Sequence, residues 1–174
     1  MPPVRFCSAC GAELPSRPPV TCSSCGTQHW LNAWPCANGI VVDAGRVLLG
    51  RRAHAPWQGL WGSPGGFCEL GEHPAETVVR EVREETGYDV EVTEYVGTWV
   101  DVYADDPAEP DAGVINVAYY RARLTSDRPA RPDPAEVSEL AWFSWDELPV
   151  ELAPPGTLEA VLAAVRNPER SRPR

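Results

Sequence analysis

Lysine is absent from this sequence: all fifteen basic residues are arginine, which excludes any chemistry that needs a lysine amine. The sequence also lacks an apolar run of about 18 residues, the length that a membrane-spanning helix requires. Its N-terminus has no apolar core of the kind that marks a signal peptide. We therefore expect a cytoplasmic protein with no membrane partner.

Positive charge is scarce as well. Fifteen basic residues stand against 25 acidic ones, and the net charge is −10 at pH 7. This balance argues against a protein that binds nucleic acid by neutralising phosphates. It leaves a phosphorylated small molecule open as a substrate, because a bound divalent cation would supply positive charge locally. The length of 174 residues, 43% of them hydrophobic, suits one full domain with a small appendage.

Four of the six cysteines form two pairs with the same spacing, Cys7-x2-Cys10 and Cys22-x2-Cys25. In a reducing compartment, paired C-x2-C units predict a tetrahedral zinc site rather than disulfides. Glycine follows each pair and supplies the tight turn that such a site needs. A unit of fewer than about 40 residues normally needs a metal to fold, so we expect a zinc ribbon over residues 1–34.

Other interpretations of the cysteines and their surroundings remain open. Either C-x2-C pair could be redox-active, although the duplicated spacing favours zinc. His29 lies three residues beyond Cys25 and could replace a cysteine as a ligand, although a packing or surface role is favoured. The remaining Cys36 and Cys68 are expected to be small buried apolar residues rather than nucleophiles.

A row of glutamates marks the middle of the chain. If residues 74–86 form a helix, Glu81, Glu84 and Glu85 stand at i, i+3 and i+4, within an arc of about 100° on one face. The adjoining face is small and apolar, so the helix can pack on one side and present acid on the other. Such a surface suits Mg²⁺ or Mn²⁺, which prefer oxygen ligands. The alternative for three glutamates alone is a solvated acidic face.

Residues on both sides of this helix favour a site. Gly65-Gly66 lets the backbone approach a ligand and leaves a carbonyl free to coordinate. Glu72 precedes the helix within reach of Arg80, which would hold it through a bidentate pair. Gly87 stands where a helix normally ends.

The segment resembles the Nudix box, G-x5-E-x7-R-E-U-x-E-E-x-G-U, in which U is aliphatic. Val82 fills the first aliphatic position, and Tyr88 stands at the second, a departure that affects packing rather than chemistry. A match of this length is far more specific than a lone glycine motif. Every fixed position is matched, by Gly66, Glu72, Arg80, Glu81, Glu84, Glu85 and Gly87.

The remaining sequence predicts elements in the order β-β-β-α-β-β-β-α. This order suits an α/β/α sandwich with a mixed sheet, preceded by the small zinc ribbon, and the Nudix resemblance implies the same fold. We place the Nudix domain at 35–168 and expect 169–174 to be a frayed tail. Residues 88–103 predict one long strand or a bent pair, and 156–166 a final helix.

The resemblance implies a hydrolase that cleaves a nucleoside diphosphate linked to another group, X. It implies Mg²⁺ (or Mn²⁺) held by Glu81, Glu84, Glu85 and the Gly66 carbonyl. Arg80 belongs to the catalytic group, where it and Glu72 are expected to hold the helix geometry rather than break bonds.

Two places compete for the general base. Glu81 and Glu85 are the candidates inside the box, while some relatives of this kind take the base from a loop outside it. Here the loop 104–113 offers four acidic residues, each of which is more commonly a solvated loop residue. They are Asp105, Asp106, Glu109 and Asp111.

A ribbon followed by a Nudix domain is similar to the NADH pyrophosphatase arrangement, but the SQPWPFPxS motif of that subgroup is missing after the box. We therefore expect a substrate like ADP-ribose, NADH or a dinucleotide without choosing among them. Arg51, Trp57, Phe67 and Tyr103 are the candidate substrate-binding residues, with core or loop packing as the alternative for the aromatic ones.

A second class of function stays open, a nucleotide-sensing regulator that uses the Nudix domain as a ligand pocket. The intact set of carboxylates favours the enzyme. The ribbon has few basic side chains, so it is not expected to bind nucleic acid. Members of the family often dimerise, which makes the resemblance compatible with a homodimer.

Overall fold

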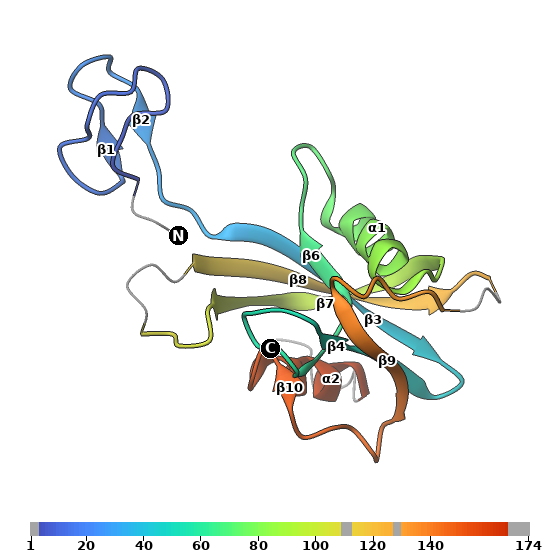
Figure 1. Cartoon of the computed structure of the whole chain (residues 1–174). Coiled ribbons are helices and arrows are strands. Elements are labelled where there is room, and N and C mark those ends of the chain that lie inside the picture. Colours follow the sequence, from blue (N-terminus) through green and yellow to red (C-terminus); the bar gives the residue numbers. More distant parts are fainter. Residues whose placement is uncertain (1–3, 109–112, 127–129, 167–174) are drawn as a thin grey trace, which may run out of the picture.

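The computed structural model describes residues 4–108, 113–126 and 130–166. Figure 1 shows a small N-terminal ribbon joined by an extended connector to a larger α/β domain. The ribbon contains β1 (Val20–Thr21) and β2 (Gln28–His29), which pair antiparallel. None of the helices in the described ranges is both long and apolar enough to cross a membrane.

One sheet forms the middle layer of the larger domain. Strand β3 runs parallel to β8, whereas β8 runs antiparallel to β7, so the predicted mixed sheet is confirmed. Strands β4, β5 and β10 continue the sheet beyond β3, with β9 paired to β4 and β6 paired to β3. The strands are β3 (Trp34–Asp43), β4 (Arg46–Arg52), β5 (Trp61–Gly62), β6 (Gly65–Phe67), β7 (Val90–Tyr103), β8 (Gly113–Leu124), β9 (Val137–Ser144) and β10 (Leu152–Ala153); the helices are α1 (Pro74–Thr86) and α2 (Thr157–Arg166).

The alternation of side chains along the strands builds two cores, one on each face of the sheet. Successive residues of a strand point to opposite faces. Ile40 accordingly belongs with Leu158 of α2 to one buried cluster, while the next residue, Val41, belongs with Val82 of α1 to the other. The predicted α/β/α sandwich is therefore confirmed.

Helix α1 is defined at both ends by its own sequence. The side chain of His73 accepts a hydrogen bond from the backbone N–H of Ala75, and the Glu76 carboxylate accepts one from the backbone N–H of His73. This reciprocal capping satisfies donors that a helix start leaves unpaired. At the other end Gly87 adopts φ 76° and donates to the carbonyl of Arg83, which stops the helix.

The structure refines two of the expectations. Residues 90–103 form one strand rather than a bent pair, with irregular register between Val92 and Glu94 and between Tyr95 and Gly97. The two-residue strands β5 and β10 were not expected, because strands this short carry no periodic pattern. The expected tail, 169–174, lies outside the described residues.

Close packing of α1 on β3 depends on Gly39, and this generates a stability prediction. A Cβ at Gly39 would lie 2.9 Å from Cγ1 of Val78 and 3.2 Å from Cγ2 of Val82. Gly39→Ala should therefore lower the free energy of unfolding by about 1–3 kcal/mol through overpacking, as urea denaturation would measure. Gly62→Ala is the matched control, because its new Cβ would meet no atom closer than 3.6 Å. Equal stability of the two variants would contradict the prediction.

Candidate active site

One arginine ties the loop before α1 to the middle of the helix. Arg80 Nε and Nη2 donate to the two carboxylate oxygens of Glu72, each at 2.9 Å. The Thr77 hydroxyl, at 2.7 Å, and the backbone N–H of Glu69, at 2.9 Å, donate to Glu72 as well. These hydrogen bonds, that from Arg80 above all, lower the pKa of Glu72 to about 2. Glu72 is therefore fixed in its ionised form as a structural anchor.

The same guanidinium reaches the acidic face of α1. Arg80 Nη1 donates to Glu81 at 2.8 Å and to Glu84 at 3.1 Å, and Nη2 donates to the carbonyl of Phe67 at 3.1 Å. The Arg80 guanidinium thus fixes the positions of the helix carboxylates relative to β6. This geometry is that of a group that positions other residues.

Two of the three box glutamates turn inward, toward β6. The side chain of Glu81 is 16% exposed, against 60% for that of Glu84. A Cβ at Gly66 would meet a Glu81 carboxylate oxygen at 2.5 Å, so a larger residue here would displace that carboxylate. The backbone N–H of Gly65 donates to Glu85 at 3.2 Å. Burial raises the pKa of both inner carboxyls, that of Glu85 to about 8, where the charge of Glu81 adds to the effect.

Glu136, just before β9, adds a fourth carboxylate that the sequence reasoning missed. With Glu85 and Arg52 it lines a small cavity next to α1. Its charge contributes to the raised pKa of Glu85, after burial and the charge of Glu81. The His54 Nε2 atom lies 2.6 Å from its carboxylate. No motif marks Glu136, because only the pairing of β9 with β4 brings it here.

The chemistry of this cluster fits a divalent cation. Glu81, Glu85 and Glu136 offer oxygen atoms, the ligands that Mg²⁺ and Mn²⁺ prefer. Without a cation, the raised pKa of Glu85 shows that the buried negative charge is poorly balanced. Among the described residues, only four cysteines have their ligand atoms close enough together to hold a metal ion. The carboxylates of Glu81, Glu85 and Glu136 would therefore have to move closer to one another to bind a cation.

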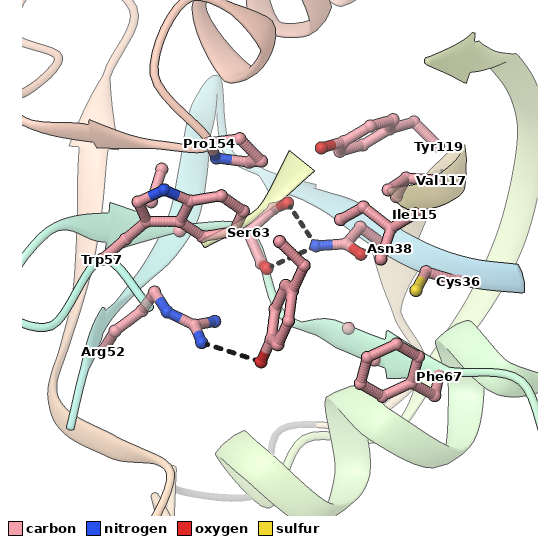
Figure 2. Close-up of a pocket in the computed structure, with 15 residues that line it drawn as sticks. Cys36, Asn38, Arg52, Trp57, Ser63, Phe67, Ile115, Val117, Tyr119 and Pro154 are labelled. Carbon is pink, nitrogen blue, oxygen red and sulfur yellow. Dashed lines mark hydrogen bonds between the residues drawn. The ribbon is translucent and has the colours of Figure 1, made fainter. Parts of the chain in front are cut away.

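A larger cavity lies beside the Gly65–Gly66 backbone on the α2 side of the sheet, with about 490 Å³ of free space that includes open solvent. It shares Arg52 and Ser63 with the small cavity at Glu85, so these two residues lie between the two cavities. Figure 2 shows Trp57 and Phe67 on its walls and Asn38, whose amide donates to Ser63, at its centre. Its mixture of flat aromatic walls and a few polar groups is typical of a site for a small molecule.

Aromatic side chains in the cavity pack edge to face. The ring centroids of Trp57 and Tyr103 are 5.6 Å apart, and those of Tyr103 and Phe67 are 5.5 Å apart. Arg52 lies over the Trp57 ring, 5.7 Å from its centroid, and donates to the Tyr103 hydroxyl at 3.4 Å. Asp105 accepts a 2.6 Å hydrogen bond from the backbone N–H of Trp57, whose φ is 63°. The loop around Trp57 is therefore held in place at the cavity.

The neighbouring arginines of β4 lie differently. Arg51 donates to the carbonyl of Gly59 at 2.8 Å and lies 3.6 Å from the carboxylate of Glu139, and it does not line the cavity. Arg52 does, because adjacent residues of a strand point to opposite sides. The sequence offered no signal that distinguished the two.

The acidic loop after β7 is only partly described. Asp105 is engaged with Trp57, and Asp106 accepts a hydrogen bond from the backbone N–H of Ala108 at 2.9 Å. Glu109 and Asp111 lie outside the described residues.

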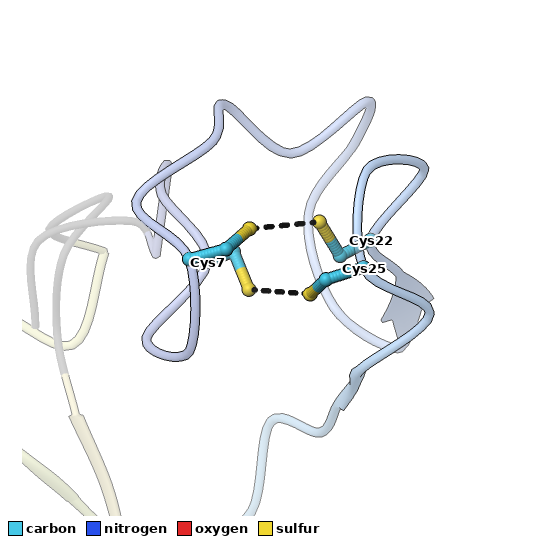
Figure 3. Close-up of side chains that lie close together, drawn as sticks. Cys7, Cys22 and Cys25 are labelled. Atoms are coloured by element: carbon cyan, nitrogen blue, oxygen red, sulfur yellow. Dashed lines mark hydrogen bonds between the residues drawn. The ribbon is translucent and has the colours of Figure 1, made fainter.

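The four predicted zinc ligands converge in the ribbon (Figure 3). Their sulfur atoms lie within 4.8 Å of one another, with Cys7 and Cys25 at 3.6 Å and Cys10 and Cys22 at 3.7 Å. All four cysteines are free. A tetrahedral zinc ion with bonds of about 2.3 Å would separate its sulfur ligands by about 3.8 Å, so the spacing fits this metal.

The two halves of the cysteine site repeat the same backbone geometry. Gly11 donates to the carbonyl of Cys7, and Gly26 donates to that of Cys22, both at 2.9 Å. His29 Nε2 lies 3.3 Å from the Cys7 sulfur, so it supports a ligand and does not replace one.

Comparison with known proteins identifies the family and the fold of this chain. The sequence model of the NUDIX domain matches residues 34–163. The NAD-capped RNA hydrolase NudC of Vibrio atlanticus (strain LGP32) is 31% identical over 160 residues, which are 89% of this chain and 54% of that protein. The mitochondrial NAD(P)H pyrophosphatase NUDT13 of Homo sapiens is 30% identical over 153 residues, 85% of this chain and 41% of that protein.

The chain thus spans about half the length of these curated relatives. Among solved structures, a NUDIX hydrolase from Nitrosomonas europaea superposes with a TM-score of 0.78 at 26% identity, covering 97% of this chain and 94% of that one. Since the family model matches residues 34–163 and the same fold recurs in that hydrolase, this chain belongs to the Nudix hydrolase family.

Proposed function

We propose that this protein is a divalent-metal-dependent pyrophosphohydrolase that cleaves the diphosphate of a nucleoside diphosphate derivative such as NADH or ADP-ribose. One observation carries the proposal: the half-buried carboxylates Glu81 and Glu85 adjoin an aromatic-walled cavity, and Arg52 lines the junction. A substrate whose flat ring occupies the cavity would extend its diphosphate past Arg52 to the carboxylates. The names of the curated relatives, which include an NAD(P)H pyrophosphatase, support this substrate class.

Glu81, Glu84 and Glu85, with the Gly66 carbonyl and Glu136, would hold Mg²⁺ or Mn²⁺, which supplies charge neutralisation at the diphosphate and a more acidic water. Arg52 binds a phosphate oxygen and orients the substrate. We assign to Glu85 the role of accepting the proton of the attacking water, since this carboxylate lines the small cavity beside Arg52 and Glu136. Arg80 keeps these groups in position.

The role of Glu85 is tested by replacing it with the neutral amide. Glu85→Gln should lower kcat by about 100-fold or more, the usual contribution of a proton acceptor. Its melting temperature should not fall, because the change removes a buried group that is costly to ionise. Glu94→Gln on the exposed side of β7 is the control and should keep both properties. Near-normal turnover of Glu85→Gln would assign the chemistry to another residue.

The substrate class is tested with a panel assayed in Mg²⁺, using a phosphatase to release phosphate from the exposed monophosphates. The panel contains NADH, ADP-ribose, FAD, a diadenosine polyphosphate, a nucleotide sugar and a nucleoside triphosphate. NAD-capped RNA joins it because a relative's name includes that substrate. We expect the highest kcat/KM for NADH or ADP-ribose. Binding of one compound without turnover of any would instead support the nucleotide-sensing alternative.

We also propose that the cysteine site holds a structural zinc ion. Cys7→Ser should reduce the zinc content from about one ion per chain to near zero, because a four-ligand site loses most of its zinc affinity when one thiolate is removed. Elemental analysis of the purified protein measures this. Cys68→Ser, outside the ribbon, is the matched control and should leave zinc in place. Unchanged zinc in Cys7→Ser would remove the assignment.

A further inference from the structure

Two buried polar atoms on the α2 side of the sheet have no hydrogen-bond partner among the described residues. They are the hydroxyl oxygen of Tyr119 and one carboxylate oxygen of Asp101. The other oxygen of Asp101 accepts a hydrogen bond from the Thr157 hydroxyl at 2.9 Å. An unpaired buried hydroxyl lowers the stability of the fold, and an unpaired buried charge lowers it more. Such groups in a folded protein call for an explanation.

Both groups belong to the cavity side of the sheet. Tyr119 is fully buried and lines the cavity, and Figure 2 shows its hydroxyl pointing inward, toward Pro154. Asp101 lies on β7 between Trp99 and Tyr103, whose rings pack on this same face of the sheet. The pKa of Tyr119 is raised, mainly by burial and next by the charge of Asp101, whose side chain does not itself line the cavity but accepts a hydrogen bond from Thr157 at the start of α2.

The cavity also has aromatic walls. Its walls carry Trp57, Phe67 and Tyr103, which suit a flat ring. The backbone on its opposite side, at Gly65 and Gly66, leads to the carboxylates. A ring placed between these walls would turn its far edge toward Tyr119 while its sugar and diphosphate extend toward α1.

We infer that Tyr119, at the polar end of this cavity, and Asp101, on the same face of the sheet, together recognise a ring edge that carries a hydrogen-bond acceptor beside an N–H donor. This inference rests on the proposed function and names two residues that determine its specificity. A tyrosine hydroxyl donates to the acceptor, and an ionised aspartate only accepts, so it takes the N–H. The carboxamide of nicotinamide and the N1/N6 edge of adenine both present this pair.

Two nearly isosteric variants test whether Tyr119 and Asp101 recognise the substrate or have a structural role alone. Tyr119→Phe removes only the unpaired hydroxyl, and Asp101→Asn keeps an oxygen for Thr157. Each should raise the KM for the preferred dinucleotide about tenfold or more, with kcat changed less than about threefold, because a lost hydrogen bond affects binding before chemistry. The melting temperature of the free protein should stay level or rise, since an unsatisfied buried group is gone.

Tyr120→Phe is the matched control, because Tyr120 lies on the same strand but packs on the α1 side of the sheet. It should leave KM unchanged. If Tyr119→Phe and Asp101→Asn also leave KM unchanged, the inference is overturned.

Two modified dinucleotides identify which ring edge is read. The nicotinic acid analogue replaces the carboxamide N–H with a carboxylate, and the hypoxanthine analogue reverses the donor and acceptor of the adenine edge. The analogue altered at the recognised edge should lose about tenfold or more in kcat/KM, and Asp101→Asn should reduce this discrimination, because an amide can donate where a carboxylate cannot. Equal use of both analogues by the wild-type protein would contradict the inference.

Titration calorimetry of the same compounds without added Mg²⁺, which leaves the zinc of the ribbon in place, separates this inference from the proposed function. If the protein binds a dinucleotide and the two variants weaken that binding, recognition stands even when no hydrolysis is seen. If hydrolysis is rapid and the variants bind as tightly as the wild type, the proposed function stands and the recognition inference fails.

Discussion

The bidentate pair between Arg80 and Glu72 is the interaction on which the rest of the candidate site depends. Glutamates that share one face of a helix repel one another, and they must also be held at a fixed distance from the neighbouring strand. Arg80 meets both needs, since its guanidinium contacts Glu72, Glu81, Glu84 and the carbonyl of Phe67. Because Glu72 remains ionised far below neutral pH, this anchor keeps its charge wherever the enzyme would work. The arginine therefore serves geometry, and the glutamates beside it are left for chemistry.

The sheet explains why acids and aromatic walls meet at one place. Strands β3 and β4 pair over only two residue pairs, Val42 with Val47 and Asp43 with Arg46, and their other ends take different partners. The segment from β5 to β6 lies in this region and pairs with both strands. The carboxylates of α1 lie on one side of it and the aromatic cavity on the other, with Arg52 and Ser63 lining both. A substrate with a ring at one end and a diphosphate in the middle matches this layout.

What the sequence predicted well is contiguous in the chain. The glutamate helix, its glycine stop and the cysteine pairs all lie within short windows in which spacing alone sets the geometry. The residues that sequence reasoning missed come from separate parts of the chain: Arg52 from β4, Asp101 from β7, Tyr119 from β8 and Glu136 from the position just before β9. Strand register brings them together, and no short pattern encodes register between distant strands. The choice of Arg51 over Arg52 illustrates this, because the difference between them is which face of β4 each occupies.

Three buried groups of this fold lack favourable interactions in the free protein. Glu85 is held in a site that disfavours its charge, while Asp101 and Tyr119 leave polar atoms buried without partners among the described residues. Each of these features lowers the stability of the free protein, and a sequence selected for folding alone would replace them with apolar groups. Glu85 lines the small cavity and Tyr119 lines the larger one, so these locally unfavourable choices indicate groups that a ligand or a cation satisfies. The same argument applies to the proposed catalytic group, Glu85, and to the proposed recognition groups, Asp101 and Tyr119. In both places the free protein lacks interactions that the bound cation or substrate is expected to supply.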